Sequence, residues 1–543
     1  MPMMTAQPAQ GLPFREFDFG ELWSSHRRLI FFALFLCAVT LILANRALLA
    51  PEEGDHAMWD YTAQAILRGQ APYKDVVNIQ APLTGYMSAL AIVAGKAAGL
   101  NDLIAIRCLF ITLAGTLLLA TLAVTESYSG SRIAALLSFF APLACPRFYS
   151  WVSIGTEPKL VMILFGMLSV LLVAKNQPFW AGFLAMLSCL SWQPGLLFAG
   201  TAMVAFWPDR RAIAKTAIAA AIPLLVTILY FYSVGALRDL WRWCFLFDLT
   251  VYAPHAYRSL TEQARHIANV ANHFVGAPGL ILLGLGAIGY VTAIAAVLRR
   301  RSRAWTLAKP SGRAPAAAIL LPPAIYVAYW RFDFNSGPYL IPIFPFAAAF
   351  AGSLIASAIR LIGSQRRGGH RKKIIGIELW QVAGLIVGAG FAVVATATSL
   401  GTKYQGSTLN DEYAALQTLT TRLSPEDTIY AQGEINILTL LNRPNISKYI
   451  WFDRGKDDFA AAEVPGGFEE ILDAIKSQKP KFVELGRSGL VRHQRDLQEW
   501  LDQDYSPFPM LGFEVYIRLA GEADSEKIEN PKVNERSKAP DAN

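Results

Sequence analysis

Long apolar runs separated by short polar segments dominate the first 400 residues of the chain. A helix needs roughly 20 apolar residues to cross the hydrocarbon core of a membrane, and many of these runs meet or approach that length. The pattern therefore predicts a mainly α-helical protein that crosses a membrane many times. The runs are 29–49, 83–100, 103–124, 133–148, 160–174, 179–206, 217–234, 280–298, 316–330, 339–361 and 379–400.

The number of crossings depends on two of these runs. Segment 83–100 contains Lys96 and three glycines, and the run 179–206 is interrupted at 191–195 by the sequence SWQPG. Either 83–100 crosses and 179–206 crosses once, or 83–100 lies in the interface and 179–206 forms two short spans. We favour the second arrangement, because a Gln-Pro-Gly sequence is poorly suited to the middle of a bilayer. The expected total is then about 11 spans.

Composition and charge assign the chain to the integral membrane proteins. Hydrophobic residues make up 54% and charged residues 17%, and the mean hydropathy is +0.34, which is too apolar for an ordinary soluble protein. The net charge of +8 does not indicate a nucleic-acid partner, because much of the excess lies in short basic clusters beside apolar runs. Such clusters mark cytoplasmic loops. They are Arg27-Arg28, Arg210-Arg211, 299–303 and 366–373.

This charge pattern predicts the orientation and the domains of a multi-pass protein of the plasma (inner) membrane. The N-terminus is expected in the cytoplasm. Segment 235–276, where tryptophans and tyrosines alternate with arginines, suits a helix at headgroup depth outside. We expect a cytoplasmic arm (1–28), a transmembrane domain (29–400) with external loops 50–82 and 235–276, a soluble extracytoplasmic α/β domain (401–520) and a charged, disordered tail (521–543).

The polar segment after the first span, PEEGDHAMWDYTAQAILRGQAPYKDVVNIQAP at 51–82, contains the main candidate residues. Its apolar positions 58, 61, 65 and 66 fall on one helical face, with Asp60, Gln64 and Arg68 on the other. The pattern predicts a helix that lies along the membrane surface, with Asp55 at its N-terminal end. A turn at 69–73 and then Asp75 follow.

This segment, GDHAMWDYTAQAILRGQAPYKD followed by APLTGY, resembles the first external loop of GT-C glycosyltransferases. It is similar in particular to bacterial multi-pass enzymes related to protein O-mannosyltransferases and lipid A aminoarabinose transferases. The resemblance implies a GT-C fold and a polyprenyl-phosphate-sugar donor whose hexose or pentose passes to an extracytoplasmic glycan, lipid or protein acceptor. It also implies that Asp55, which matches the family's catalytic Asp, is the general base. His56 stands where relatives commonly have an acidic or amide residue.

A second match is SWVSIGTEPK at 150–159, similar to the family's second external loop. Glu157 takes the place of an acidic residue that often faces the catalytic Asp in relatives. Asp55 and Glu157 are therefore catalytic candidates that could share a divalent metal such as Mg²⁺ or Mn²⁺, which many relatives do not need. A weaker match, RFDFNSGPYLIPIFPF, begins at Arg331.

The chemistry of such a donor agrees with these residues. A lipid phosphate is a good leaving group, so an inverting transferase needs chiefly a carboxylate to deprotonate the acceptor hydroxyl, and cations for the departing phosphate. The cationic candidates are Arg68, Lys74, Arg258, Arg265 and Arg331. Residues expected to position the first loop are His56, Tyr73, Asp75 and Gln80, and Gln80 stands near the place where relatives often have a lysine.

Each candidate also has a purely structural interpretation. Asp55 is a favoured residue type for a helix N-cap, Asp75 suits a turn, and Glu157 beside Pro158 suits a helix start. The arginines of 235–276 suit lipid headgroups. Two other functions stay open: a polytopic transporter, although paired Gly/Pro-broken helices in two halves are not visible, and a non-catalytic scaffold of envelope assembly.

Overall fold

The computed structural model divides into two compact units, Met1–Tyr413 and Ala414–Asn543. The described residues are 23, 25–44, 47–52, 54–252, 259–299, 316–365, 373–374, 377–378, 386, 390, 393–394, 397, 407–433, 435–452, 455–485, 493–510 and 513–519. Most of the predicted arm 1–28, most of the predicted span 379–400 and the whole of the predicted tail 521–543 therefore lie outside the described residues.

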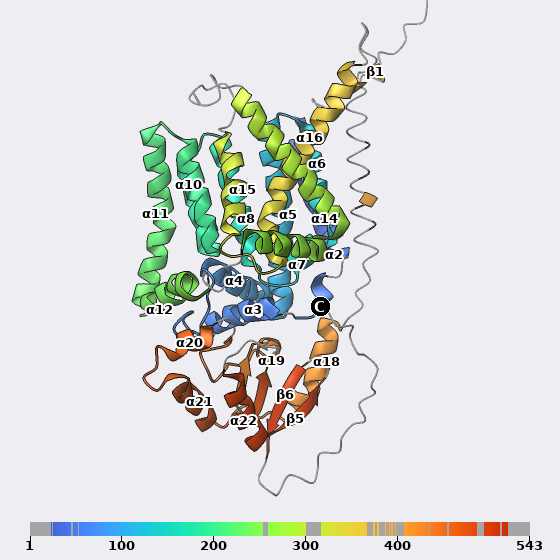
Figure 1. Cartoon of the computed structure of the whole chain (residues 1–543). Coiled ribbons are helices and arrows are strands. Elements are labelled where there is room, and N and C mark those ends of the chain that lie inside the picture. Colours follow the sequence, from blue (N-terminus) through green and yellow to red (C-terminus); the bar gives the residue numbers. More distant parts are fainter. Residues whose placement is uncertain are drawn as a thin grey trace, which may run out of the picture. The chain divides into compact units, whose positions relative to one another are not determined.

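The first unit is a bundle of helices (Figure 1). In chain order these are α2 (Arg27–Ala44), η1 (Ala47–Leu49), α3 (Gly54–Leu67), α4 (Leu83–Ala97), α5 (Asp102–Ser129), α6 (Arg132–Leu143), α7 (Pro146–Ser153), α8 (Pro158–Ala174), α9 (Pro178–Ser191), η2 (Gln193–Gly195), α10 (Leu196–Ala205), α11 (Arg210–Ser233), α12 (Leu237–Trp241), η3 (Arg242–Leu246), η4 (Asp248–Tyr252), α14 (Leu260–Arg299), α15 (Ala317–Tyr329), η5 (Gly337–Ile343) and α16 (Phe344–Gln365), followed by two short strands, β1 (Lys373–Ile374) and β2 (Ile377–Glu378).

Five helical stretches among the described residues are long and apolar enough to cross a membrane. They are Arg27–Leu49, Asp102–Ser129, Arg210–Ser233, Leu260–Arg299 and Gly337–Leu361. Four shorter apolar helices, α6, α8, α9 and α15, have 12 to 17 residues. The structure thus supports a multi-pass helical protein, and the expected total of about 11 spans is not confirmed.

The run 179–206 is broken where its sequence predicted a break. Helix α9 ends at Ser191, Trp192 is extended (φ −154°, ψ 134°), and α10 begins at Leu196. The turn between them is tight, because a Cβ on Gly195 would lie 2.4 Å from the carbonyl oxygen of Ser188. The Gln193 side chain donates a hydrogen bond to the carbonyl oxygen of Ile79 at 2.8 Å. The turn between α9 and α10 therefore lies against the segment that joins α3 to α4.

Helix α14 contains two segments with different directions. Gly276 has non-helical angles (φ 61°, ψ −173°), which a residue without a Cβ adopts at little cost. Figure 1 shows the part before this kink, 260–275, running crosswise beside α7, and the part after it running along the bundle. The polar part of α14 before Gly276 therefore runs in a different direction from the apolar part after it. The sequence predicted such a difference, because 235–276 suits a helix at headgroup depth and 280–298 is an apolar run.

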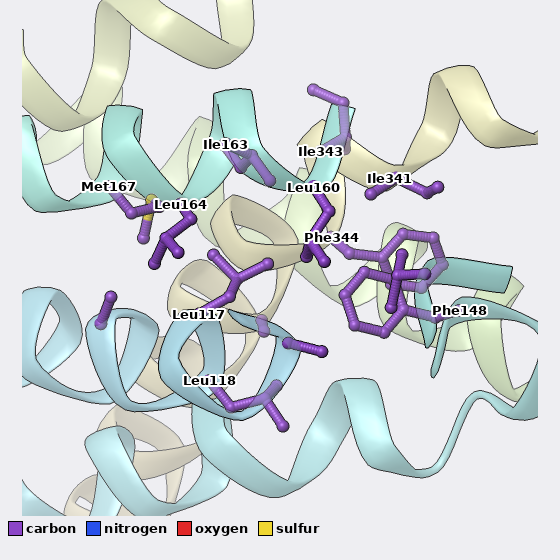
Figure 2. Packing of buried hydrophobic residues seen from close by; sticks show 14 of the residues in the cluster. Leu117, Leu118, Phe148, Leu160, Ile163, Leu164, Met167, Ile341, Ile343 and Phe344 are labelled. Carbon is purple, nitrogen blue, oxygen red and sulfur yellow. The ribbon is translucent and has the colours of Figure 1, made fainter. Parts of the chain in front are cut away.

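The centre of the bundle is packed by side chains from α5, α7, α8, η5 and α16 (Figure 2). Phe148 on α7 and Phe344 on α16 have ring centroids 5.1 Å apart, and Leu160 on α8 is fully buried. Lipid tails are as apolar as these side chains, so close packing rather than removal from water holds such helices together. The packing fixes the ends of α7 and α8, and thus the loop 154–157 between them.

The second unit contains a four-stranded sheet of order β3-β4-β6-β5, in which β3 and β4 are parallel and the other pairs antiparallel. Its elements are β3 (Ile429–Gln432), α19 (Asn436–Leu441), α20 (Lys456–Ala461), α21 (Gly467–Ser477), β4 (Phe482–Leu485), α22 (Gln494–Asp504), β5 (Tyr505–Met510) and β6 (Phe513–Arg518). Helix α18 (Leu409–Thr420) contains the boundary between the units. The predicted α/β character of this part of the chain is confirmed.

Candidate active site

The chain just before α3 is held in place by Arg107, a fully buried residue of α5. Its guanidinium donates hydrogen bonds to the carbonyl oxygens of Leu48 (3.0 Å), Ala50 (2.6 Å) and Pro51 (3.3 Å), and to the carboxylate of Glu52 (3.1 Å). The planar fork of an arginine suits several acceptors at once. These bonds fix the chain just before α3 and therefore the first turn of that helix.

A second contact joins α3 to the loop between α7 and α8. The buried carboxylate of Asp60 accepts the backbone N–H of Thr156 at 3.0 Å, and the hydroxyl of Thr156 lies 2.7 Å from that of Ser88 on α4. Burial raises the pKa of Asp60 to about 6, although the hydrogen bonds from Thr156 lower it. Burial, followed by the charge of Asp60, raises the pKa of Glu52 well above its usual range.

Asp55 lies in the first turn of α3 and is partly buried. Among the residues that the structure describes, no side chain or backbone group forms a hydrogen bond or ion pair with its carboxylate. The charge of Asp55 acts on Glu157, the other carboxylate that the resemblance singled out. Burial is the main cause of the raised pKa of Glu157, and the charge of Asp55 raises it further.

Glu157 is fully buried and occupies the N-cap of α8. Its Oε1 accepts the backbone N–H of Lys159 at 3.0 Å and faces the Lys159 ammonium at 3.4 Å. Its Oε2 accepts the indole N–H of Trp151 at 2.8 Å. The helix-start role of Glu157 is therefore present in the structure.

The ammonium of Lys159 lies among three aromatic rings from separate parts of the chain. The ring centroids of Trp59, Trp192 and Tyr339 are 5.3, 5.0 and 5.2 Å from its Nζ, and Lys159 is only 5% exposed. Sequence reasoning missed both Lys159 and Arg107. The sequence feature that could have identified both residues is a cation within or beside an apolar run, because such cations are rare and usually have a partner.

His56 follows Asp55 in the first turn of α3, and its ring is completely buried. Neither ring nitrogen has a hydrogen-bond partner in the described part of the chain, and the ring packs on Trp59 (5.8 Å) and Trp151 (5.0 Å). Burial, and then the charges of Arg107 and Lys159, lower the pKa of His56 to about 3. The imidazole is therefore neutral and fills space between α3 and α7.

The remaining loop candidates form the turn after α3. The Tyr73 hydroxyl donates to the carbonyl oxygen of Gln80 at 2.6 Å. Asp75 accepts the backbone N–H of Ala71 at 2.7 Å, which agrees with its structural interpretation as a turn residue. Tyr73 and Gln80 together close this turn, in which Tyr73 has a positive φ of 71°.

The predicted cations lie in different parts of the fold. Arg68 is at the opposite end of α3, about 20 Å away along the helix axis, with its guanidinium 5.0 Å from the Tyr61 ring. The Lys74 ammonium donates to the carbonyl oxygen of Val234 at 3.4 Å. Arg265 is exposed on α14, and Arg331 is partly exposed after α15. Arg258 lies outside the described residues.

The site residues do not fit a metal shared by Asp55 and Glu157. Both oxygens of Glu157 already accept N–H groups, and an ammonium lies beside one of them. The described residues contain no group of three or more His, Cys, Asp or Glu side chains that would hold a metal ion.

No family model and no curated protein sequence matches the chain. Among solved structures, it is similar to ArnT from Cupriavidus metallidurans bound to undecaprenyl phosphate, with a TM-score of 0.57 over 92% of this chain and 99% of that chain, at 12% sequence identity. The chain has a GT-C fold. ArnT in the apo state matches this GT-C fold with a TM-score of 0.55, over 92% of this chain and 98% of that chain, at 12% identity.

A more distant likeness is to the archaeal oligosaccharyltransferase AglB from Archaeoglobus fulgidus, in complex with an inhibitory peptide and a dolichol-phosphate. Its TM-score is 0.48 over 85% of this chain and 70% of that chain, at 14% identity. At these identities the comparisons concern the fold. The GT-C fold predicted from the first-loop sequence is confirmed.

Proposed function

We propose that the protein is a membrane glycosyltransferase that uses a polyprenyl-phosphate-linked sugar as donor. The sugar is transferred with inversion to an extracytoplasmic glycan, lipid or protein, and Asp55 is the general base. The fold shared with ArnT, which was solved with undecaprenyl phosphate bound, supports this class of donor. The proposed orientation has the N-terminus in the cytoplasm and the first external loop and second unit outside.

The observation that carries the proposal is the difference between Asp55 and the other carboxylates nearby. Asp60 and Glu157 are buried and accept backbone N–H groups. The carboxylate of Asp55 is partly exposed and has no such partner among the described residues. A general base must reach the proton that it removes, and Asp55 is the acid of this group whose oxygens are available to a substrate.

The reaction needs one proton transfer and one displacement. Asp55 takes the proton of the acceptor hydroxyl while the oxygen attacks the anomeric carbon from the face opposite the phosphate. The bond between the anomeric carbon and the phosphate oxygen breaks, and the polyprenyl phosphate leaves with the electron pair. Arg265, Arg331, Arg258 and Lys74 remain the candidate cations for this phosphate, whereas Arg68 lies about 20 Å from Asp55 along α3. Glu157 is the second catalytic candidate and assists Asp55.

The test compares two substitutions in the same loop. Asp55→Asn keeps the size of the side chain and removes the base, so transfer in membranes should fall by about 10²-fold or more at normal expression. Asp75→Asn is the matched control, because Asp75 accepts only a local turn hydrogen bond, and it should retain activity. Near-normal transfer by Asp55→Asn would remove Asp55 as the base.

A further inference from the structure

We propose that Lys159 supplies the positive charge of the carboxylate site in place of a divalent metal, and that it positions Glu157. The inference rests on the proposed function only for its activity measurements. Lys159 is thus a positioning residue that acts through Glu157 and makes the site independent of metal ions.

The first step is the coordination of Glu157. Each of its oxygens accepts an N–H group, from Trp151 on one side and from the backbone of Lys159 on the other. Carboxylate oxygens bind Mg²⁺ or Ca²⁺ at about 2.0–2.6 Å, and each oxygen of Glu157 keeps a second lone pair after it accepts its N–H group. The Lys159 ammonium lies 3.4 Å from Oε1, so a divalent cation bound there would be repelled by the lysine.

The second step is the confinement of the lysine. An ammonium over an aromatic face is attracted by the negative potential of the ring, and here three rings surround it at 5.0–5.3 Å. Trp59 comes from α3, Trp192 from the turn after α9 and Tyr339 from η5. Three separately positioned segments therefore hold the ammonium against Glu157.

The third step distinguishes this role from direct binding of a phosphate. The side chain of Lys159 is 6% exposed and that of Glu157 is fully buried. The ammonium faces the carboxylate and the rings, so a lipid phosphate does not reach it without displacing one of them. Loss of the lysine should accordingly lower kcat and leave the KM for the donor nearly unchanged.

The experiment uses the full-length protein, stripped of metal and purified in detergent. Wild type should transfer sugar equally well with and without EDTA, and millimolar MnCl₂ should not change its unfolding temperature. Lys159→Gln removes the positive charge beside Glu157 and leaves the negative charges of Asp55 and Glu157 without it, so kcat should fall by about tenfold or more. The same variant should gain a Mn²⁺-dependent rise of several degrees in unfolding temperature.

Three further variants complete the design. Lys159→Arg keeps a cation and should show no Mn²⁺ response, and the double variant Lys159→Gln/Glu157→Gln should lose the response that Lys159→Gln gained. Lys96→Gln is the matched control, because Lys96 also lies 3.4 Å from a carboxylate, that of Asp102, but its side chain is 55% exposed. It should behave as wild type in every assay.

Specific results would overturn the inference. They are loss of wild-type transfer in EDTA with recovery in Mn²⁺, stabilisation of wild type by Mn²⁺, absence of a Mn²⁺ response in folded Lys159→Gln, or a rise in donor KM without a fall in kcat. The wild-type arms need no variant to fold. If wild type transfers no sugar at all, the proposed function fails, and the Mn²⁺ response of the unfolding temperature still decides the role of Lys159.

Discussion

Replacing Arg107 with methionine tests whether one buried guanidinium holds the chain before α3 in place. Arg107 is fully buried and donates to three carbonyl oxygens and to Glu52. Methionine has a similar length but no donor, so these acceptors lose their partner. Removing one member of a buried ion pair costs about 3–5 kcal/mol, and the unpaired carbonyls add to this. We expect a loss of about 4 kcal/mol or more in the free energy of unfolding.

The matched control is Arg27→Met. Arg27 also pairs with a carboxylate, that of Glu126 at 2.8 Å, but its side chain is 53% exposed. Exposed pairs contribute about 0–1 kcal/mol, so this variant should unfold close to wild type. The contrast between the two arginines measures the effect of burial, because both substitutions remove one positive charge from an ion pair.

Thermal unfolding in detergent, followed by a thiol-reactive dye, suits this protein because Cys145 and Cys244 are free and buried. Arg107→Met should lower the unfolding temperature by several degrees more than Arg27→Met. Adding Glu52→Gln to Arg107→Met should recover part of the loss, since it removes the unpaired carboxylate. An unfolding temperature of Arg107→Met equal to that of Arg27→Met would refute this account of the loop.

Three other predictions concern α3 and the helix packing. The folded pKa of Asp60 is about 6, above an unfolded value of about 3.9, so the folded state binds more protons in this window and stability falls as the pH rises through it. Asp60→Asn should remove that fall, which is about 3 kcal/mol, in unfolding curves measured between these pH values; an unchanged pH profile would contradict it. His56→Phe should keep expression and transfer near wild type, because neither ring nitrogen has a partner among the described residues, and a large loss of transfer would assign the imidazole a chemical role. Gly182→Ala should lower the unfolding temperature, because its Cβ would lie 2.1 Å from the carbonyl oxygen of Thr216 on α11, whereas Gly200→Ala meets nothing within 4 Å; equal effects of the two substitutions would argue against close packing of α9 on α11.

Features with a local cause were predictable from the sequence. The apolar runs between residues 29 and 361 correspond to helices, and the break in 179–206 follows from a local Gln-Pro-Gly sequence. Strand β5 was not predictable, because its sequence YSPFPM contains two prolines, which are tolerated only at an edge position such as the one it occupies. The expectation that Asp55 and Glu157 belong to one site rested on a family resemblance rather than on the physics of the sequence.

The residues that hold the site together were not predictable, because their partners are distant in the chain. Trp59, Trp192 and Tyr339 meet around Lys159 only after three segments have packed. The prediction for Arg68, by contrast, could have been corrected from the sequence itself. Thirteen residues of helix separate it from Asp55 by about 20 Å, so helix geometry alone indicated that the two side chains occupy different ends of α3.

The central claim, transfer of a sugar from a lipid-linked donor with Asp55 as base, is tested most directly by intact mass spectrometry of envelope lipids and glycans. The measurement compares a strain that lacks the gene with the same strain complemented by wild type or by Asp55→Asn. The account predicts that one glycan, lipid or protein loses a single sugar in the deletion strain while a polyprenyl-phosphate sugar accumulates. Wild type should restore the product and Asp55→Asn should not. An unchanged envelope, or full restoration by Asp55→Asn, would contradict the account.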